Sequence, residues 1–226
     1  MYTYLIINAI AIGLPMIATF FPWHRFDRKW KYVFPAILLT MIIFIPWDIA
    51  FTDAGVWGFN PKYLSGIYIF NLPLGEWLFF ICIPYATLFT YDAMNFMIRK
   101  DVMGRLGPWL AGILGIGFLV VGFANLDKLY TFITFISTGL FLLLHLLVLR
   151  SKYMGRFFLA YGVVIIPFLI INGILTGSHI EEQVVWYNDA ENLGIKIFTI
   201  PVDDFVYSLL LQGLNVTFFE TFQRKY

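Results

Sequence analysis

Residues 56–76 read VWGFNPKYLSGIYIFNLPLGE, and residues 185–204 repeat them in degenerate form as VWYNDAENLGIKIFTIPVDD. Each copy places a Val-Trp-aromatic-Asn cluster before a Gly-Ile pair, which starts at Gly66 in the first copy and at Gly194 in the second. Seven residues after each glycine comes a proline, Pro73 or Pro201, followed by an acidic residue and an apolar run. The repeat predicts one site built from two related halves, with carboxyl groups at its centre.

The composition around this repeat is typical of an integral membrane protein. Hydrophobic residues make up 60% of the 226 residues and charged residues 13%, whereas soluble domains carry about 25% charged residues. The net charge of +1 gives no reason to expect a nucleic-acid partner. The single cysteine, Cys82, excludes an intrachain disulfide framework and a Cys-rich metal site.

The hydropathy pattern predicts an all-α protein with seven transmembrane helices, because a spanning helix needs roughly 20 mostly apolar residues. The predicted spans are 3–21, 32–52, 74–98, 106–123, 129–149, 156–175 and 201–222. Of the 15 Lys and Arg residues, 12 fall in the odd-numbered connections and the C-terminal tail. Since basic residues favour the cytoplasmic side, we expect a multi-pass protein of the cell membrane with its N-terminus outside and its C-terminus in the cytoplasm.

The same pattern predicts two parallel three-helix repeats in a single transmembrane domain, 1–226. Repeat one covers 1–98, a linker with one helix covers 99–128, and repeat two covers 129–226. The linker helix restores the chain direction, so matched helices run the same way and are related by an axis near the membrane normal. Proline suits the first turn of a helix, so we expect Pro73 and Pro201 to open the helices that follow them. Both motif loops then lie on the non-cytoplasmic side.

Four carboxyl groups near these motifs are the candidate catalytic residues: Asp48, Glu76, Asp203 and Asp204. Acids inside a membrane span are costly and usually serve a purpose. Several acids in a low-dielectric site cannot all ionise, so at least one stays protonated, as acid and base catalysis requires. A purely structural role remains open. The helix dipole favours acids in a first turn, and backbone groups freed by Pro46 suit a buried Asp48.

Aromatic side chains surround the same motifs and are the candidate substrate-binding residues. Their electron-rich faces can stabilise a cation, although an interfacial belt and helix packing explain aromatic residues equally well. Two asparagines at this level can orient carboxyl groups or satisfy loop backbone. The complete set is Trp47, Trp57, Trp77, Phe80, Tyr207, Asn60 and Asn188.

Several motifs are missing from the sequence. It has no Gly-x-Gly-x-x-Gly after a strand, no phosphate-binding glycine loop with lysine, and no Asp-x-x-x-Asp pair for magnesium. His24, His145 and His179 are too scattered to form a metal set. We therefore expect neither a cofactor nor a metal.

The motif combination resembles the membrane-embedded lycopene cyclase domain. The likeness rests on Pro-Trp-Asp (46–48), Gly-Val-Trp-x-Phe-Asn-Pro (55–61), Leu-Pro-x-x-Glu with Leu-Phe-Phe (72–80) and the second copy. In that family two small three-helix subunits form a heterodimer or are fused, and this chain resembles the fused form over nearly its whole length. The family pattern Pro-x-Glu-Glu reads Pro-Leu-Gly-Glu in copy one and Pro-Val-Asp-Asp in copy two, so Glu76 is the one acid left in copy one.

The resemblance implies a lycopene β-cyclase of carotenoid biosynthesis, an isomerase that closes the ψ ends of lycopene into β-ionone rings without net redox change. It implies lycopene or a related acyclic carotenoid as substrate, the bilayer as surroundings, and Glu76 with Asp203 or Asp204 as acid and base. Asp48 would tune or relay the proton. Two other classes remain open: a proton-coupled transporter, and a non-catalytic membrane partner of another carotenoid enzyme. The absence of acids at mid-span argues against a transport path.

Overall fold

The computed structural model describes residues 2–225, and over these residues the chain forms seven α-helices. Their bounds are α1 Thr3–Ala18, α2 Trp30–Asp53, α3 Leu74–Met97, α4 Leu106–Ala124, α5 Leu129–Leu143, α6 Met154–Leu175 and α7 Val202–Lys225. A π-helical turn, Leu144–Val148, continues α5, and short 3-10 helices form at Phe26–Lys29 and Pro61–Tyr63. The chain is therefore predominantly helical, as the apolar pattern predicts.

Five helices of the described chain are long and apolar enough to cross a membrane. They are Phe26–Asp53, Leu74–Met97, Leu106–Ala124, Leu129–Val148 and Met154–Leu175. The predicted first span, 3–21, is too long, because α1 ends at Ala18 and leaves an apolar helix of 16 residues. The α7 helix is long enough, but polar and charged residues lower its hydropathy. Three of those side chains, Ser208, Gln212 and Asn215, are buried and so lie inside the bundle.

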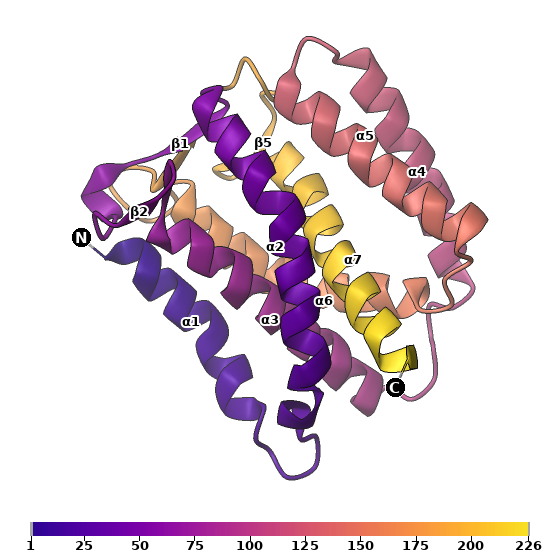
Figure 1. The fold of residues 1–226 in the computed structure, drawn as a ribbon. Coiled ribbons are helices and arrows are strands. Elements are labelled where there is room, and N and C mark those ends of the chain that lie inside the picture. The colour runs from indigo at the N-terminus through magenta and orange to yellow at the C-terminus, as the bar shows by residue number, and fades with distance from the viewer. Residues whose placement is uncertain (1, 226) are drawn as a thin grey trace.

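The helices form one bundle around a shared apolar core (Figure 1). Two pairs make its sides, with α1 packed on α3 and α4 packed on α5. The α2 helix packs on α7, which also contacts α5, and α6 packs on α3. The two segments with the repeated motif therefore feed helices, α3 and α7, that contact each other inside the bundle.

The motif segments themselves contain six short strands, which the apolar pattern does not reveal. Strand β1 (Trp57–Phe59) pairs antiparallel with β4 (Val185–Tyr187), so the first motif segment is joined to the second. The pairing places Gly58 opposite Trp186. Each segment then makes its own two-stranded ribbon, β2 (Tyr68–Ile69) with β3 (Leu72–Pro73) and β5 (Lys196–Ile197) with β6 (Ile200–Pro201). These strands gather at the end of the bundle where α1 begins (Figure 1).

Both prolines precede their helices, so the prediction that they open them is wrong by one residue. Pro73 is the last residue of β3, in an extended conformation with φ −67° and ψ 152°, and α3 begins at Leu74. The N–H of Leu74 donates to Ile67 O at 2.9 Å, and the N–H of Val202 donates to Ile195 O at 2.9 Å. These ribbon bonds hold the extended prolines at the helix entrance. Gly66 and Gly194 supply the left-handed conformations, φ +79° and +70°, that begin the two ribbons.

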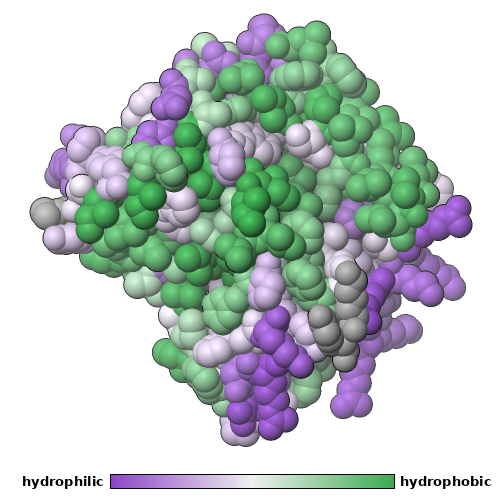
Figure 2. All heavy atoms as spheres, viewed as in Figure 1, coloured by the Kyte–Doolittle hydropathy of each residue, from purple (hydrophilic) through white to green (hydrophobic). Residues whose placement is uncertain are grey.

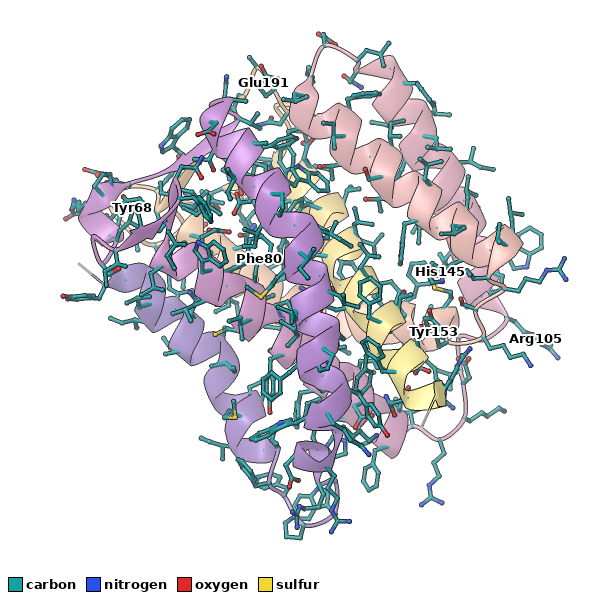
Figure 3. The ribbon with its side chains drawn as sticks, viewed as in Figure 1. Tyr68, Phe80, Arg105, His145, Tyr153 and Glu191 are labelled. Atoms are coloured by element: carbon teal, nitrogen blue, oxygen red, sulfur yellow. The ribbon has the colours of Figure 1, made fainter. Side chains whose placement is uncertain are left out.

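The surface separates polar ends from an apolar girdle. Figure 2 shows hydrophobic residues across the middle of the visible face and strongly hydrophilic residues concentrated toward its ends. Figure 3 shows Tyr68 and Glu191 toward the end that carries the strands, and Arg105 at the opposite end. Also away from the strands, His24 and Lys29 hold the buried Asp92 at 2.9 and 2.6 Å. This distribution fits a protein embedded in a bilayer.

Candidate active site

Asp48 lies in α2, two residues after Pro46, and is 1% exposed. Its Oδ1 accepts a hydrogen bond from Trp57 Nε1 at 2.7 Å. Its Oδ2 is buried and has no hydrogen-bond partner among the described residues. Asp48 therefore keeps one carboxyl oxygen free for a group that enters the site.

Glu76 lies in the first turn of α3 and accepts a hydrogen bond from the hydroxyl of Tyr4 in α1. The neighbouring Gly75 explains why this copy has one acid fewer. A Cβ at Gly75 would lie 2.7 Å from Tyr4 Cδ1 and Cγ, so a side chain there would displace the ring. Asn8 fastens the same turn by donating to Gly75 O at 2.7 Å. The missing acid thus makes room for the tyrosine that binds Glu76.

Asp204 lies in the first turn of α7 and accepts three hydrogen bonds. Tyr130 donates to Oδ1 at 2.6 Å, while Asn172 and Tyr187 donate to Oδ2 at 2.8 and 2.9 Å. Burial and the adjacent Asp204 carboxylate raise the pKa of Tyr187 well above its ordinary value, so this phenol keeps the proton that it donates. These three hydrogen bonds can stabilise the ionised form of Asp204 without a positively charged side chain beside it.

Asp203 points elsewhere, although it is adjacent in sequence and fully buried. Its Oδ1 accepts from Thr131 Oγ1 at 2.5 Å, and its Oδ2 accepts from the backbone N–H of Leu193 at 3.2 Å. These bonds tie the start of α7 to α5 and to the preceding loop. Asp203 does not line the cavity described next.

A narrow cavity of about 70 Å³ brings three of the four predicted acids together, Asp48, Glu76 and Asp204. No lysine, arginine or histidine of the described chain lines it. Since a low-dielectric cavity strengthens repulsion between like charges, the three groups cannot all be ionised together. The arrangement can therefore both donate and accept a proton.

Aromatic rings line the same cavity, among them Trp57 and Tyr207 from the predicted set. The ring of Trp57 lies 5.0 Å from that of Tyr130 and 6.1 Å from that of Tyr207, measured between centroids. Trp47 does not line the cavity but packs edge-to-face against the ring of Tyr207, with ring centroids 5.3 Å apart. Figure 3 shows Phe80 inside the bundle, and it packs against Phe44 rather than lining the cavity.

Three other predicted residues lie outside the cavity. Trp77 donates to Ile69 O at 3.2 Å and stacks on Phe70 at the ribbon. Asn60 donates to Glu182 at 2.8 Å, and Asn188 accepts from the backbone N–H of Ala190 at 3.1 Å. These contacts stabilise the ribbon and the loops of the two motif segments.

Sequence reasoning missed Tyr4 and Tyr130, the tyrosines that donate hydrogen bonds to Glu76 and Asp204 respectively. Tyr4 lies in the first turn of α1 and Tyr130 in the first turn of α5. These two helices occupy matching positions in the predicted repeats. An alignment of those helix starts, Tyr4-Leu-Ile-Ile with Tyr130-Thr-Phe-Ile, carries the signal. Gln212 was also missed. It is fully buried, lines the cavity, and neither polar atom of its side chain has a partner among the described residues.

The fold and the site define a helical membrane protein with a buried cluster of carboxyl groups and aromatic rings. The family model described as lycopene cyclase matches residues 1–94 and 127–222. The chain therefore belongs to the lycopene cyclase family, whose activity is the cyclisation of a carotenoid. The segment between the two matched parts, 95–126, contains α4. No curated protein and no solved structure matches the chain.

Proposed function

We propose that the protein is a lycopene β-cyclase that works by redox-neutral acid and base catalysis. The observation that carries this proposal is the convergence of Asp48, Glu76 and Asp204 in one cavity lined by aromatic rings. A carboxylic acid protonates C2 of the terminal double bond and leaves a cation at C1. The C5–C6 double bond attacks C1 to close the ring, and a carboxylate then removes the proton from C6. One proton enters and one leaves, so no electron donor is needed.

The hydrogen bonds suggest how the carboxyl groups share this work. Asp204 suits the base, because three donors stabilise its ionised form. Asp48 and Glu76 suit the proton-donating side, since each accepts a single hydrogen bond. Asp48 also has an oxygen free to meet the substrate. Asp203 is then a structural residue that ties the start of α7 to α5 and to the preceding loop.

The aromatic rings would protect the cationic intermediate. Trp57, Tyr130 and Tyr207 face the cavity together, and ring faces attract a cation most strongly where water is excluded. Removing water also prevents the cation from being captured as an alcohol.

We also propose that all seven helices cross the membrane as two parallel repeats, α1–α3 and α5–α7, joined by α4. The antiparallel pairing of β1 with β4, the matching ribbons, and the tyrosine that binds the acid in each half support this arrangement. The basic connection that carries Arg105 lies at the end opposite the strands (Figure 3), which supports a cytoplasmic C-terminus and a site near the outer face.

The proposal is tested by expressing the chain in a host that accumulates lycopene and separating its pigments by chromatography. The wild type should form β-rings, while Glu76→Gln and Asp204→Asn should each lose about 10²-fold or more of the rate, the usual contribution of an acid or base. Wild-type rates in both variants would refute the acid and base assignment. In D₂O, each ring formed should gain one deuteron at C2, and product without deuterium would refute the protonation step.

A further inference from the structure

We propose that the groove between α1 and α6 is the binding site for the polyene chain of the carotenoid and its lateral entrance from the bilayer. This inference rests on the proposed function and specifies where the rest of the substrate lies while one end reacts. The groove has a volume of about 340 Å³, and helix α3 forms its floor. Its walls include Leu14 on α1 and Ile170 on α6, which are 76% and 59% exposed on the outer surface.

The groove continues into the carboxyl cavity. Five residues line both spaces: Phe79, Ile83, Phe168, Asn172 and Ser208. One of them, Asn172, donates directly to Asp204. A molecule that fills the groove therefore ends against the acids.

The direction of α3 sets the alignment of such a molecule. The groove floor runs along this helix from Phe79 to Thr90, which is about 16 Å at the helical rise of 1.5 Å per residue. Glu76 lies one turn before Phe79 on the same helix. A straight chain lying along α3 would thus present its end group to the carboxyl cavity while its remaining length stays in the groove.

The lining matches a hydrocarbon that has no polar groups. Most of the walls are aliphatic or aromatic, and the hydroxyl of Thr90 is occupied by a hydrogen bond to Ala86 O at 2.8 Å. A second apolar groove, of about 400 Å³ on α4 and lined by Trp109 and Ile113, shares no residue with the carboxyl cavity. Connection to the acids therefore distinguishes the α1–α6 groove from an ordinary lipid-facing hollow.

The test is Ala86→Trp, which places an indole in the groove about 15 Å along α3 from Glu76, too far to touch the acids. Lycopene binding is measured by quenching of tryptophan fluorescence in phosphatidylcholine nanodiscs, with Glu76→Gln added to every protein so that product formation is slow during the measurement. We expect binding to weaken about tenfold or more, because the indole occupies groove volume that the polyene would otherwise fill. In the active background, KM for lycopene should rise by a similar factor.

Ala124→Trp, on the exposed end of α4, is the matched control and should bind and cyclise lycopene like the wild type. Thr90→Trp gives a second block in the groove if Ala86→Trp does not fold. Unchanged lycopene binding and KM in a folded groove variant would overturn the proposal. If lycopene binding and KM are unchanged but the groove variant loses a phospholipid that co-purifies with the wild type, the groove is a lipid-binding site. If the wild type binds lycopene through the groove but forms no ring, the proposed function fails and the groove assignment stands.

Discussion

Asp203 and Asp204 are neighbours in sequence but face different surroundings, so removing the carboxylate of each should have opposite consequences. Replacing Asp203 with alanine removes two hydrogen bonds, from Thr131 Oγ1 and from the N–H of Leu193. Hydrogen bonds to a charged group contribute about 1.5–3 kcal/mol each. With partial relaxation of the freed donors, we expect Asp203→Ala to lower the free energy of unfolding by about 3 kcal/mol.

For a chain of this length, that loss lowers the melting temperature by about 6–12 °C. The surviving folded protein should still cyclise lycopene at a rate near that of the wild type, because Asp203 does not line the cavity. Asp204→Asn should do the reverse. Its partners Tyr130 and Tyr187 have hydroxyls that can rotate to accept as well as donate, so the fold survives while the base is lost.

The assay combines thermal melting in detergent with the rate of ring formation per folded molecule. A folded Asp203→Ala protein with wild-type melting and a rate reduced about 10²-fold would refute this division, because it would place Asp203 in the chemistry. Wild-type turnover by Asp204→Asn would refute the assignment of Asp204 as the base.

Three further predictions follow from contacts at the motif end. In Gly58→Ala, the new Cβ would overlap Cζ2 of Trp186, so stability should fall by about 1–3 kcal/mol and recover when Trp186→Ala is added; a melting temperature that does not recover would contradict the contact. Tyr130→Phe removes the hydroxyl that donates to Asp204 at 2.6 Å and should lower stability by about 1.5–3 kcal/mol, where an unchanged melt would show that the bond contributes nothing. The hydrogen bond from Asn60 and the charge of Lys62 lower the pKa of Glu182, so this link between the motif segments is present above the ordinary glutamate range and lost as the pH falls below it. Amide exchange of residues 60–64, corrected for intrinsic rates, should be faster at about pH 3 than at about pH 6, and equal corrected rates would count against the link.

Local sequence was sufficient to predict most helix positions and several residues of the site. The apolar runs predict the starts of all seven described helices to within two residues, and the motif spacing identifies Glu76 and Asp204. These features depend on hydropathy and on turn residues close together in the chain. The seven-span topology and the catalytic roles stay predictions.

The remaining features depend on contacts between distant segments. Nothing local to Trp57 predicts that its strand pairs with β4, because that pairing joins segments that are separated in the chain by four helices, α3 to α6. The separation of Asp203 from Asp204 arises because one side chain meets Thr131 of α5 and the other meets the central cavity. Likewise, the missing acid at Gly75 is explained only once the ring of Tyr4 is seen against it.

The pairing of β1 with β4 also constrains the order in which the protein can be completed during synthesis. Chains are made from the N-terminus, so Asp48 and Glu76 enter the membrane while strand β4 and helix α7 do not yet exist. Trp57 can already donate its hydrogen bond to Asp48, but the edge of β1 stays unpaired until β4 is made and Trp186 pairs with Gly58. Asp204 lies in the first turn of α7, the last helix, so a nascent chain carries the two proposed proton donors without the proposed base. The cavity that joins Asp48, Glu76 and Asp204 is therefore completed only at the final stage of folding.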